Sequence, residues 1–223
     1  MKIDIVERLD ADRPPASNDY LLVRELTHRI NNEFALMIGL ISRVASRSAS
    51  AEVKDALSGV VNILHDYAGS HRALEIPTYS TVIDASDYIR ALCQAIRRTK
   101  LDLRDIELVL VEHSLHMRSE QCWRLGMIVS ELITNSARHA FDDRGGTIRV
   151  ELSGSGPFAE CCVMDNGSTR GSHGPGQGLR IVEALARELN GEIAYRFGAE
   201  GALSRLRFPI SGDAVQGPER FSH

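Results

Sequence analysis

The stretch that most constrains how this chain can fold is residues 126–141, GMIVSELITNSARHAF. Its apolar residues recur at intervals of three and four, which predicts one uninterrupted helix with a broad buried face. Glu131, Asn135 and His139 follow one another four residues apart, so they form a polar stripe along the border of that face. The stripe is either a solvent-facing helix edge or one wall of a ligand site.

Composition excludes several classes of function. The net charge of −4 does not indicate a polyanion such as nucleic acid as a partner, and no apolar run reaches the roughly 20 residues that a membrane span needs. The N-terminus lacks the apolar core of a signal peptide. The four cysteines (Cys93, Cys122, Cys161 and Cys162) lack the spacing of a zinc site or a disulfide framework. We therefore expect a soluble cytoplasmic protein without a nucleic-acid partner.

The first third of the chain predicts a helical hairpin. Residues 1–18 are polar and contain a Pro-Pro pair, so we expect a flexible arm. Two amphipathic helices follow within residues 19–77, the first from about 20 and the second over about 51–75, with a Ser-rich turn between them. Because one apolar stripe per helix cannot close a core alone, we infer a homodimer that forms a four-helix bundle.

Helices and strands alternate in the next segment, residues 78–211. The pattern predicts an α+β sandwich, followed by a disordered tail over 212–223. Helices are expected at about 84–99 and 178–189 besides the one at 126–141, and strands at 106–113, 147–152, 159–165, 192–197 and 202–208.

Three pieces in this segment suit a nucleotide. Asp165 ends a strand, where its carboxylate can accept a hydrogen bond from an exocyclic amine such as that of adenine, and Gly167 lets the backbone approach a flat ring. Gly176, Gly178 and Leu179 belong to a Gly-rich loop that opens a helix, where free N–H groups bind phosphate. The Asn135 amide oxygen suits Mg²⁺. Each piece alone is weak, since most DNG sequences are only turns.

In their order, these residues resemble the N box and the two G boxes of the GHKL (Bergerat) ATP-binding fold, which histidine kinases share with gyrase-type ATPases and Hsp90-like chaperones. The resemblance covers about residues 84–210 and implies ATP and Mg²⁺ as cofactors. It assigns Mg²⁺ to Asn135, adenine to Asp165, and the lid over the phosphates to Gly176 and Gly178. Glu131 would support the metal through water or hold the pocket together, and His139 would contact either the nucleotide or a structural partner.

His28 lies in ELTHRINNEF, midway along the first predicted helix. The E-L-x-H-R-x-x-N pattern resembles the phosphoacceptor helix of HWE-related histidine kinases. The resemblance implies that His28 takes the γ-phosphoryl group of ATP and passes it to an Asp of a response-regulator receiver domain. Glu25 would orient the imidazole. Asn32 would orient a water or phosphoryl oxygen and would take part in phosphatase action on the receiver.

The resemblance is incomplete. Only ten residues separate Asp165 from Gly176, and Ala202 stands where relatives have a threonine. A non-catalytic phosphotransfer adaptor with a vestigial ATP site therefore remains the alternative to a histidine kinase core. An anti-sigma type serine kinase would not need the hairpin. No sensor domain is visible, so the signal is expected from a separate protein, from the arm or from the dimer surface.

Overall fold

The computed structural model describes residues 18–74, 81–141, 145–168 and 177–210. Residues 1–17 of the predicted arm, the predicted tail and the lid glycine Gly176 lie outside these ranges. The elements in chain order are α1 (Asn18–Arg47), α2 (Ala51–Ala73), β1 (Val82–Asp84), α3 (Ala85–Ile96), the π-helical turn η1 (Arg97–Leu101), the 3-10 turn η2 (Asp102–Arg104), β2 (Ile106–Glu112), β3 (His116–Arg118), α4 (Ser119–His139), β4 (Gly146–Ser155), β5 (Phe158–Asp165), α5 (Gln177–Glu188), β6 (Glu192–Gly198) and β7 (Gly201–Pro209).

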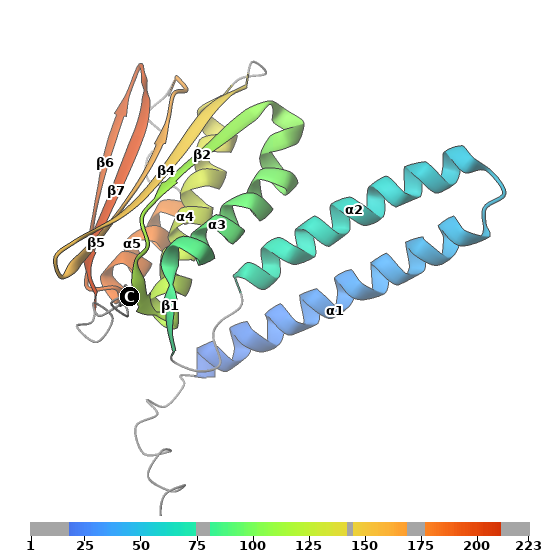
Figure 1. The fold of residues 1–223 in the computed structure, drawn as a ribbon, viewed down its shortest axis with the longest axis horizontal. Coiled ribbons are helices and arrows are strands. Elements are labelled where there is room, and N and C mark those ends of the chain that lie inside the picture. The colour runs from blue at the N-terminus through green and yellow to red at the C-terminus, as the bar shows by residue number, and fades with distance from the viewer. Residues whose placement is uncertain (1–17, 75–80, 142–144, 169–176, 211–223) are drawn as a thin grey trace, which may run out of the picture.

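Helices α1 and α2 form the predicted antiparallel hairpin, which projects away from the rest of the chain (Figure 1). Each helix carries two apolar stripes rather than one. The inner stripes are half-buried between the helices and include Phe34, Ile38, Ile41, Leu57, Val61 and Leu64. The outer stripes are exposed and include Leu26, Ile30, Met37, Leu40 and Val44 on α1 and Val53, Val60, Ile63 and Tyr67 on α2. The hairpin therefore leaves apolar surface uncovered.

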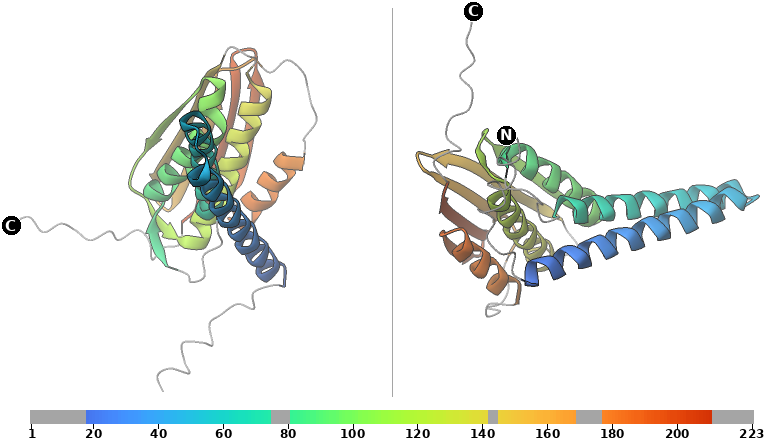
Figure 2. Two further views of the ribbon diagram at one scale, coloured as in Figure 1. Left: turned by 90° about the vertical axis from the view of Figure 1, so that its right-hand side faces the viewer. Right: turned by 90° about the horizontal axis from the view of Figure 1, so that it is seen from below.

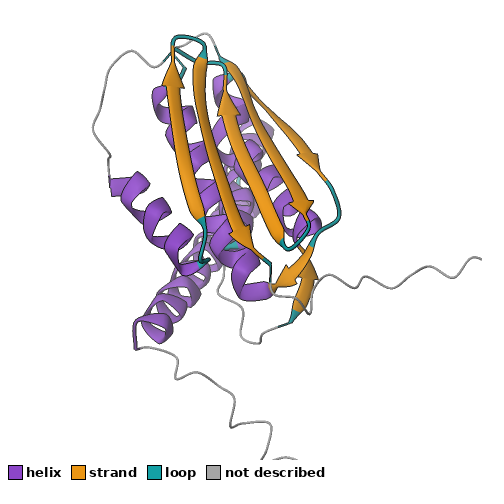
Figure 3. Ribbon diagram, turned by 90° about the vertical axis from the view of Figure 1, so that its left-hand side faces the viewer, coloured by secondary structure: helices purple, strands orange, loops and turns teal. Residues whose placement is uncertain are grey.

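A five-stranded sheet forms the body of the second part, with the strand order β2-β4-β5-β7-β6. Strand β2 pairs with β4 in parallel, and the other neighbours are antiparallel. Helices α3, α4 and α5 cover one face of the sheet and the other face is open (Figure 3). Strand β4 shows why the sheet has this orientation. Its alternate residues Ile148, Val150 and Leu152 are fully buried, while Arg149 and Glu151 form an ion pair of 2.6 Å on the open face.

The apolar arc of α4 is the centre of the core, as its periodicity predicts. Ile128, Val129 and Ile133 are fully buried against the sheet and α3, although the helix ends at His139, two residues before Phe141. Among the described residues, no helix is long and apolar enough to cross a lipid bilayer.

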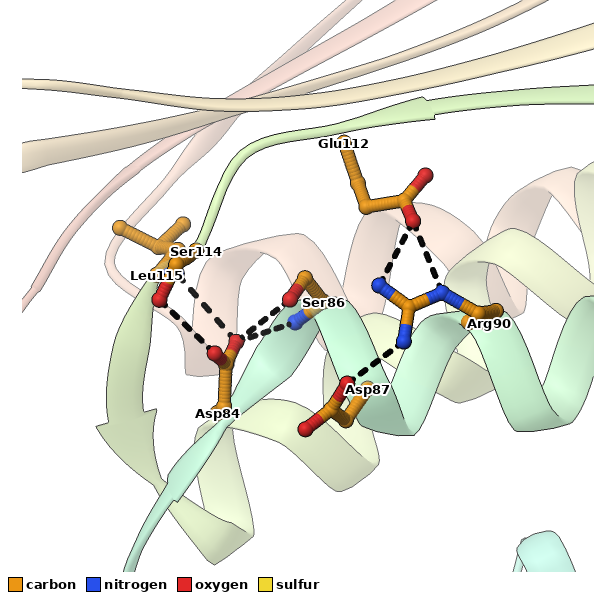
Figure 4. A network of polar contacts seen from close by, with 7 residues as sticks. All are labelled: Asp84, Ser86, Asp87, Arg90, Glu112, Ser114 and Leu115. Carbon is orange, nitrogen blue, oxygen red and sulfur yellow. Dashed lines mark hydrogen bonds and ion pairs between the residues drawn. The ribbon is translucent and has the colours of Figure 1, made fainter.

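The small sheet of β1 and β3 was not predicted. It brings Asp84 to the N-terminus of α3, where its carboxylate accepts hydrogen bonds from the backbone N–H and hydroxyl of Ser86 at 2.8 and 2.7 Å (Figure 4). The Ser114 hydroxyl and the Leu115 N–H, next to β3, donate to the same carboxylate. Burial raises the pKa of Asp84, but these hydrogen bonds outweigh it and lower the pKa to about 2. Asp84 therefore caps α3 and fixes it to the β2–β3 connection.

The hairpin lies on the helical side of the sheet, where α2 runs alongside α3 (Figure 2). Polar contacts between described residues join the parts. Arg98 of η1 forms an ion pair of 3.4 Å with Asp66 of α2, and the Trp123 indole N–H of α4 donates to the Leu74 carbonyl at 2.9 Å. Trp123 thus holds the end of the hairpin.

Candidate functional site

The polar edge of α4 meets the N-terminus of α5. Glu131 and Asn135 are half-buried, one helical turn apart, and His139 is exposed in the last turn. A Cβ atom at Gly178 would overlap the Glu131 carboxylate and would lie 3.2 Å from the Asn135 side-chain nitrogen. Glycine is therefore what lets the first turn of α5 lie directly on these two side chains, which are 43 to 47 residues away in the sequence.

Asp165, at the end of β5, is held by three donors from three elements. The Ser136 hydroxyl of α4 donates to one carboxylate oxygen at 2.7 Å. The backbone N–H groups of Gly167 and Ala202 donate to the other oxygen at 3.2 and 3.1 Å. An ionised carboxylate has about four acceptor positions, so one position remains for a further donor.

Two glycines make this arrangement possible. A Cβ at Gly167 would overlap the Ala140 carbonyl oxygen, so only glycine lets the chain after β5 pass the end of α4. Gly201 has a φ of 123°, which side-chain-bearing residues rarely adopt, and a Cβ there would overlap the Asp165 carbonyl oxygen. Gly201 thereby allows β7 to begin beside Asp165 and to present the Ala202 N–H to it.

The geometry fits the chemistry of a nucleotide with a divalent cation. Asp165 can accept from an exocyclic amine, and the free N–H groups that open α5 suit phosphate oxygens. Asn135 and Glu131 offer oxygen ligands, which Mg²⁺ prefers. In the described part of the chain, no group of three or more His, Cys, Asp or Glu side chains could hold a metal. A metal here would thus need oxygens from the nucleotide and water as well. Leu179 is half-buried and packs against the core.

Sequence reasoning missed two side chains next to this site. Ser136 directly follows Asn135 on the predicted helix, and its hydroxyl contacts Asp165 at the end of β5. This adjacency to Asn135 was the available signal in the sequence. Lys100 of η1 donates from Nζ to the Thr134 hydroxyl at 3.0 Å. Burial lowers the pKa of Lys100, the Glu131 carboxylate opposes this shift, and Arg138 adds to it. No sequence spacing connects Lys100 to α4.

The proposed phosphoacceptor lies on the hairpin, outside this cluster. His28 is exposed on α1, and Asn32 is exposed one turn later. Glu25 accepts a hydrogen bond of 2.9 Å from the Arg29 side chain. The predicted contact of Glu25 with His28 would compete with this exposed ion pair, which is weak enough to exchange.

Comparisons with known proteins agree with this organisation. The HisKA_2 histidine kinase model matches residues 25–100, a range that contains His28. Blue-light-activated histidine kinase 2 of Erythrobacter litoralis (strain HTCC2594) is 28% identical over 202 residues, which cover 84% of this chain and 56% of that protein. Sensor histidine kinase PdtaS of Mycobacterium tuberculosis (strain ATCC 25618 / H37Rv) is 26% identical over 216 residues, which cover 93% of this chain and 43% of that protein.

Solved structures show the fold. The histidine kinase domain of Erythrobacter litoralis EL346 superposes with a TM-score of 0.56 and 21% identity, over 79% of this chain and 96% of that domain. The predicted fold class, a helical hairpin before a GHKL-type sandwich, is confirmed. The chain spans about half the length of the curated relatives it matches. The family model matches the hairpin and the first helix of the sandwich, and the sandwich has the fold of histidine kinase domains, so this chain is similar to histidine kinases in both of its parts.

Proposed function

We propose that this chain is the catalytic core of a two-component histidine kinase, which transfers the γ-phosphoryl group of Mg-ATP to His28 and then to an Asp of a response-regulator receiver domain. The observation that carries the proposal is the joint placement of Asp165, Asn135 and Gly178 at one end of the sandwich, in a chain whose hairpin presents an exposed His28. The nucleotide site alone would also fit a nucleotide-binding module, and the hairpin alone would also fit a phosphotransfer adaptor.

Each residue of the site has a separate role in the proposed reaction. Asp165 accepts a hydrogen bond from the adenine amine and thereby fixes the position of the base. The α5 N-terminus binds the phosphates, and Asn135, supported by Glu131, would hold Mg²⁺, which would supply charge neutralisation for the transferred phosphoryl group. An imidazole nitrogen of His28 forms the new P–N bond while the bond from γ-phosphorus to the bridging oxygen breaks, with ADP as the leaving group. The imidazole proton passes to a carboxylate, a role that Glu25 fills after releasing Arg29.

The outer stripes of the hairpin support a dimer. Leu40 and Val44 are 52% and 59% exposed, and Ile63 on α2 is 47% exposed. Large exposed apolar side chains on both helices favour burial against another apolar surface. A second hairpin would complete a four-helix bundle, in which either protomer's ATP domain can serve a given His28.

The segments carry separate parts of this function. We assign dimerisation and phosphate acceptance to residues 19–77 and ATP binding to residues 78–211. The exposed Asn32 would assist in receiver dephosphorylation. The four buried free cysteines suit the reducing cytoplasm. Signal input would come from a separate sensor or from segments outside the described residues.

The test is incubation with Mg²⁺ and ATP labelled in its γ-phosphate. A histidine kinase gives protein-bound label that acid removes and base does not. A phosphotransfer adaptor is the second candidate, because the lid is short and Ala202 lacks the hydroxyl that relatives carry at this position. An adaptor would acquire no label from ATP but would acquire it from a phosphorylated receiver domain. Label from ATP that resists acid would contradict both functions.

A further inference from the structure

The π-helical turn η1 is an irregular segment without a role in the reaction proposed above. It continues α3 with a wider turn, a feature that recurs at functional sites. Thr99 is 5% exposed, and its hydroxyl donates to the carbonyls of Ala95 and Ile96 at 2.9 and 3.2 Å. Leu101 is fully buried. Thr99 and Leu101 thus anchor the turn in the core, and the residues between and beside them extend from this anchored segment.

Lys100 connects this turn to the candidate nucleotide site. Its ammonium donates to the hydroxyl of Thr134, which immediately precedes Asn135 on α4. Glu131 lies within electrostatic reach, since its carboxylate acts on the pKa of Lys100. The contact therefore fixes the part of α4 that carries both predicted metal-supporting side chains, and it places one positive charge beside them.

Arg98 connects the same turn to the hairpin. Its guanidinium lies 3.4 Å from the Asp66 carboxylate of α2, with the two side chains 53% and 35% exposed. Helix α2 packs against both α3 and η1, so this ion pair lies within an extended contact. Two residues of one turn thus contact the hairpin and α4, respectively.

We propose that Arg98 and Lys100 are positioning residues, through which η1 couples docking of the phosphoacceptor hairpin to nucleotide binding at Asn135. The proposal rests on the proposed function and adds residues outside the recognised boxes. Nucleotide phosphates and Lys100 attract each other, so binding holds η1 in the position seen here, where Arg98 meets Asp66. Coupling between two sites is reciprocal. The factor by which nucleotide binding favours docking of the hairpin is therefore the factor by which loss of the docked contact weakens nucleotide binding.

The experiment measures Mg-ADP affinity of the full chain by titration with a fluorescent ADP analogue. Lys100→Met should weaken binding about tenfold, as for loss of a hydrogen bond to a charged group, and Lys100→Arg should restore most of it. Asp66→Asn, which touches no pocket residue, should weaken binding about two- to fivefold, since exposed pairs are weak. Arg97→Gln on the same turn is the matched control, because Arg97 pairs locally with Asp102 at 3.7 Å; it should bind as the wild type does.

A double variant separates coupling from general destabilisation. In a Lys100→Met background, Asp66→Asn should have no further effect on affinity, whereas two unrelated losses would multiply. The charge swap of Asp66→Arg with Arg98→Asp should recover wild-type affinity. Unchanged affinity in Asp66→Asn, or multiplying effects in the double variant, would overturn the proposal. If the wild type binds no Mg-ADP, the proposed function fails instead, so the two failures are distinguishable.

Discussion

Replacement of Asp165 by asparagine separates nucleotide recognition from folding. Asparagine has the same shape and keeps one oxygen, which can still accept from the N–H groups of Gly167 and Ala202. The new amide nitrogen would occupy the place of the oxygen now 2.7 Å from the Ser136 hydroxyl. That hydroxyl can rotate and accept instead of donating. The internal network therefore survives, and we expect a loss in stability of about 1 kcal/mol or less.

Nucleotide binding should respond much more strongly. The position that faces an adenine amine changes from acceptor to donor, so a charge-assisted hydrogen bond is lost and two donors oppose each other. Hydrogen bonds to charged groups contribute roughly 1.5–3 kcal/mol, which corresponds to about a 10- to 100-fold weaker affinity. Guanine carries a carbonyl at the equivalent position, so Asp165→Asn should also reduce the preference for adenine over guanine nucleotides.

Two measurements check this prediction. Titration with Mg-ADP and Mg-GDP gives the affinities, and thermal unfolding gives the stability, with a shift of about 2–4 °C for each kcal/mol in a chain of this size. Asp102→Asn removes an exposed carboxylate near Arg97 and is the control for loss of charge. Affinity for Mg-ADP within twofold of the wild type in a folded Asp165→Asn variant would refute the role of Asp165.

The remaining predictions concern the frame of the site and the dimer. Gly167→Ala should lower the unfolding free energy by about 2 kcal/mol or more, since its Cβ would meet the backbone carbonyl of Ala140. Gly178→Ala meets only a movable side-chain tip, so thermal unfolding should shift by under about 1 kcal/mol while nucleotide affinity falls. Asp84→Ala should cost about 1–2 kcal/mol in denaturant unfolding. Because the pKa of Asp84 is lowered, its contribution is present above its ordinary value of 3.8 and disappears as pH falls through about 2. Leu40→Glu should shift the mass by light scattering from dimer to monomer, with the helix content retained; an unchanged dimer would contradict the bundle.

Periodicity predicted the regular elements well, for physical reasons. The apolar arc of α4 and the alternation of β4 each report burial on one face, which tertiary structure then satisfies. Strands β1 and β3 have three residues each, too few for any period to appear. In the turn η1, Leu101 follows Ile96 by five residues, and this single interval is too little to reveal that the helix widens there.

The site was predictable where one local segment carries its chemistry. Asn135 lies on the polar edge of a predicted helix, Asp165 ends a predicted strand, and glycines mark close backbone approach. Contacts between distant segments were not predictable. The contact of Lys100 with Thr134 spans 34 residues and depends on how α3 packs against α4. Likewise, the three donors to Asp165 come from α4, β7 and the chain after β5, and only the folded sheet brings them together.

The most direct test of the proposed phosphotransfer compares three proteins incubated with Mg²⁺ and γ-labelled ATP. The wild type and His65→Ala, whose histidine is exposed on the other helix of the hairpin, should both acquire acid-labile, base-stable label. His28→Ala should acquire none while binding Mg-ADP as tightly as the wild type. Equal labelling of His28→Ala and the wild type would contradict the assignment of His28 as the phosphoacceptor.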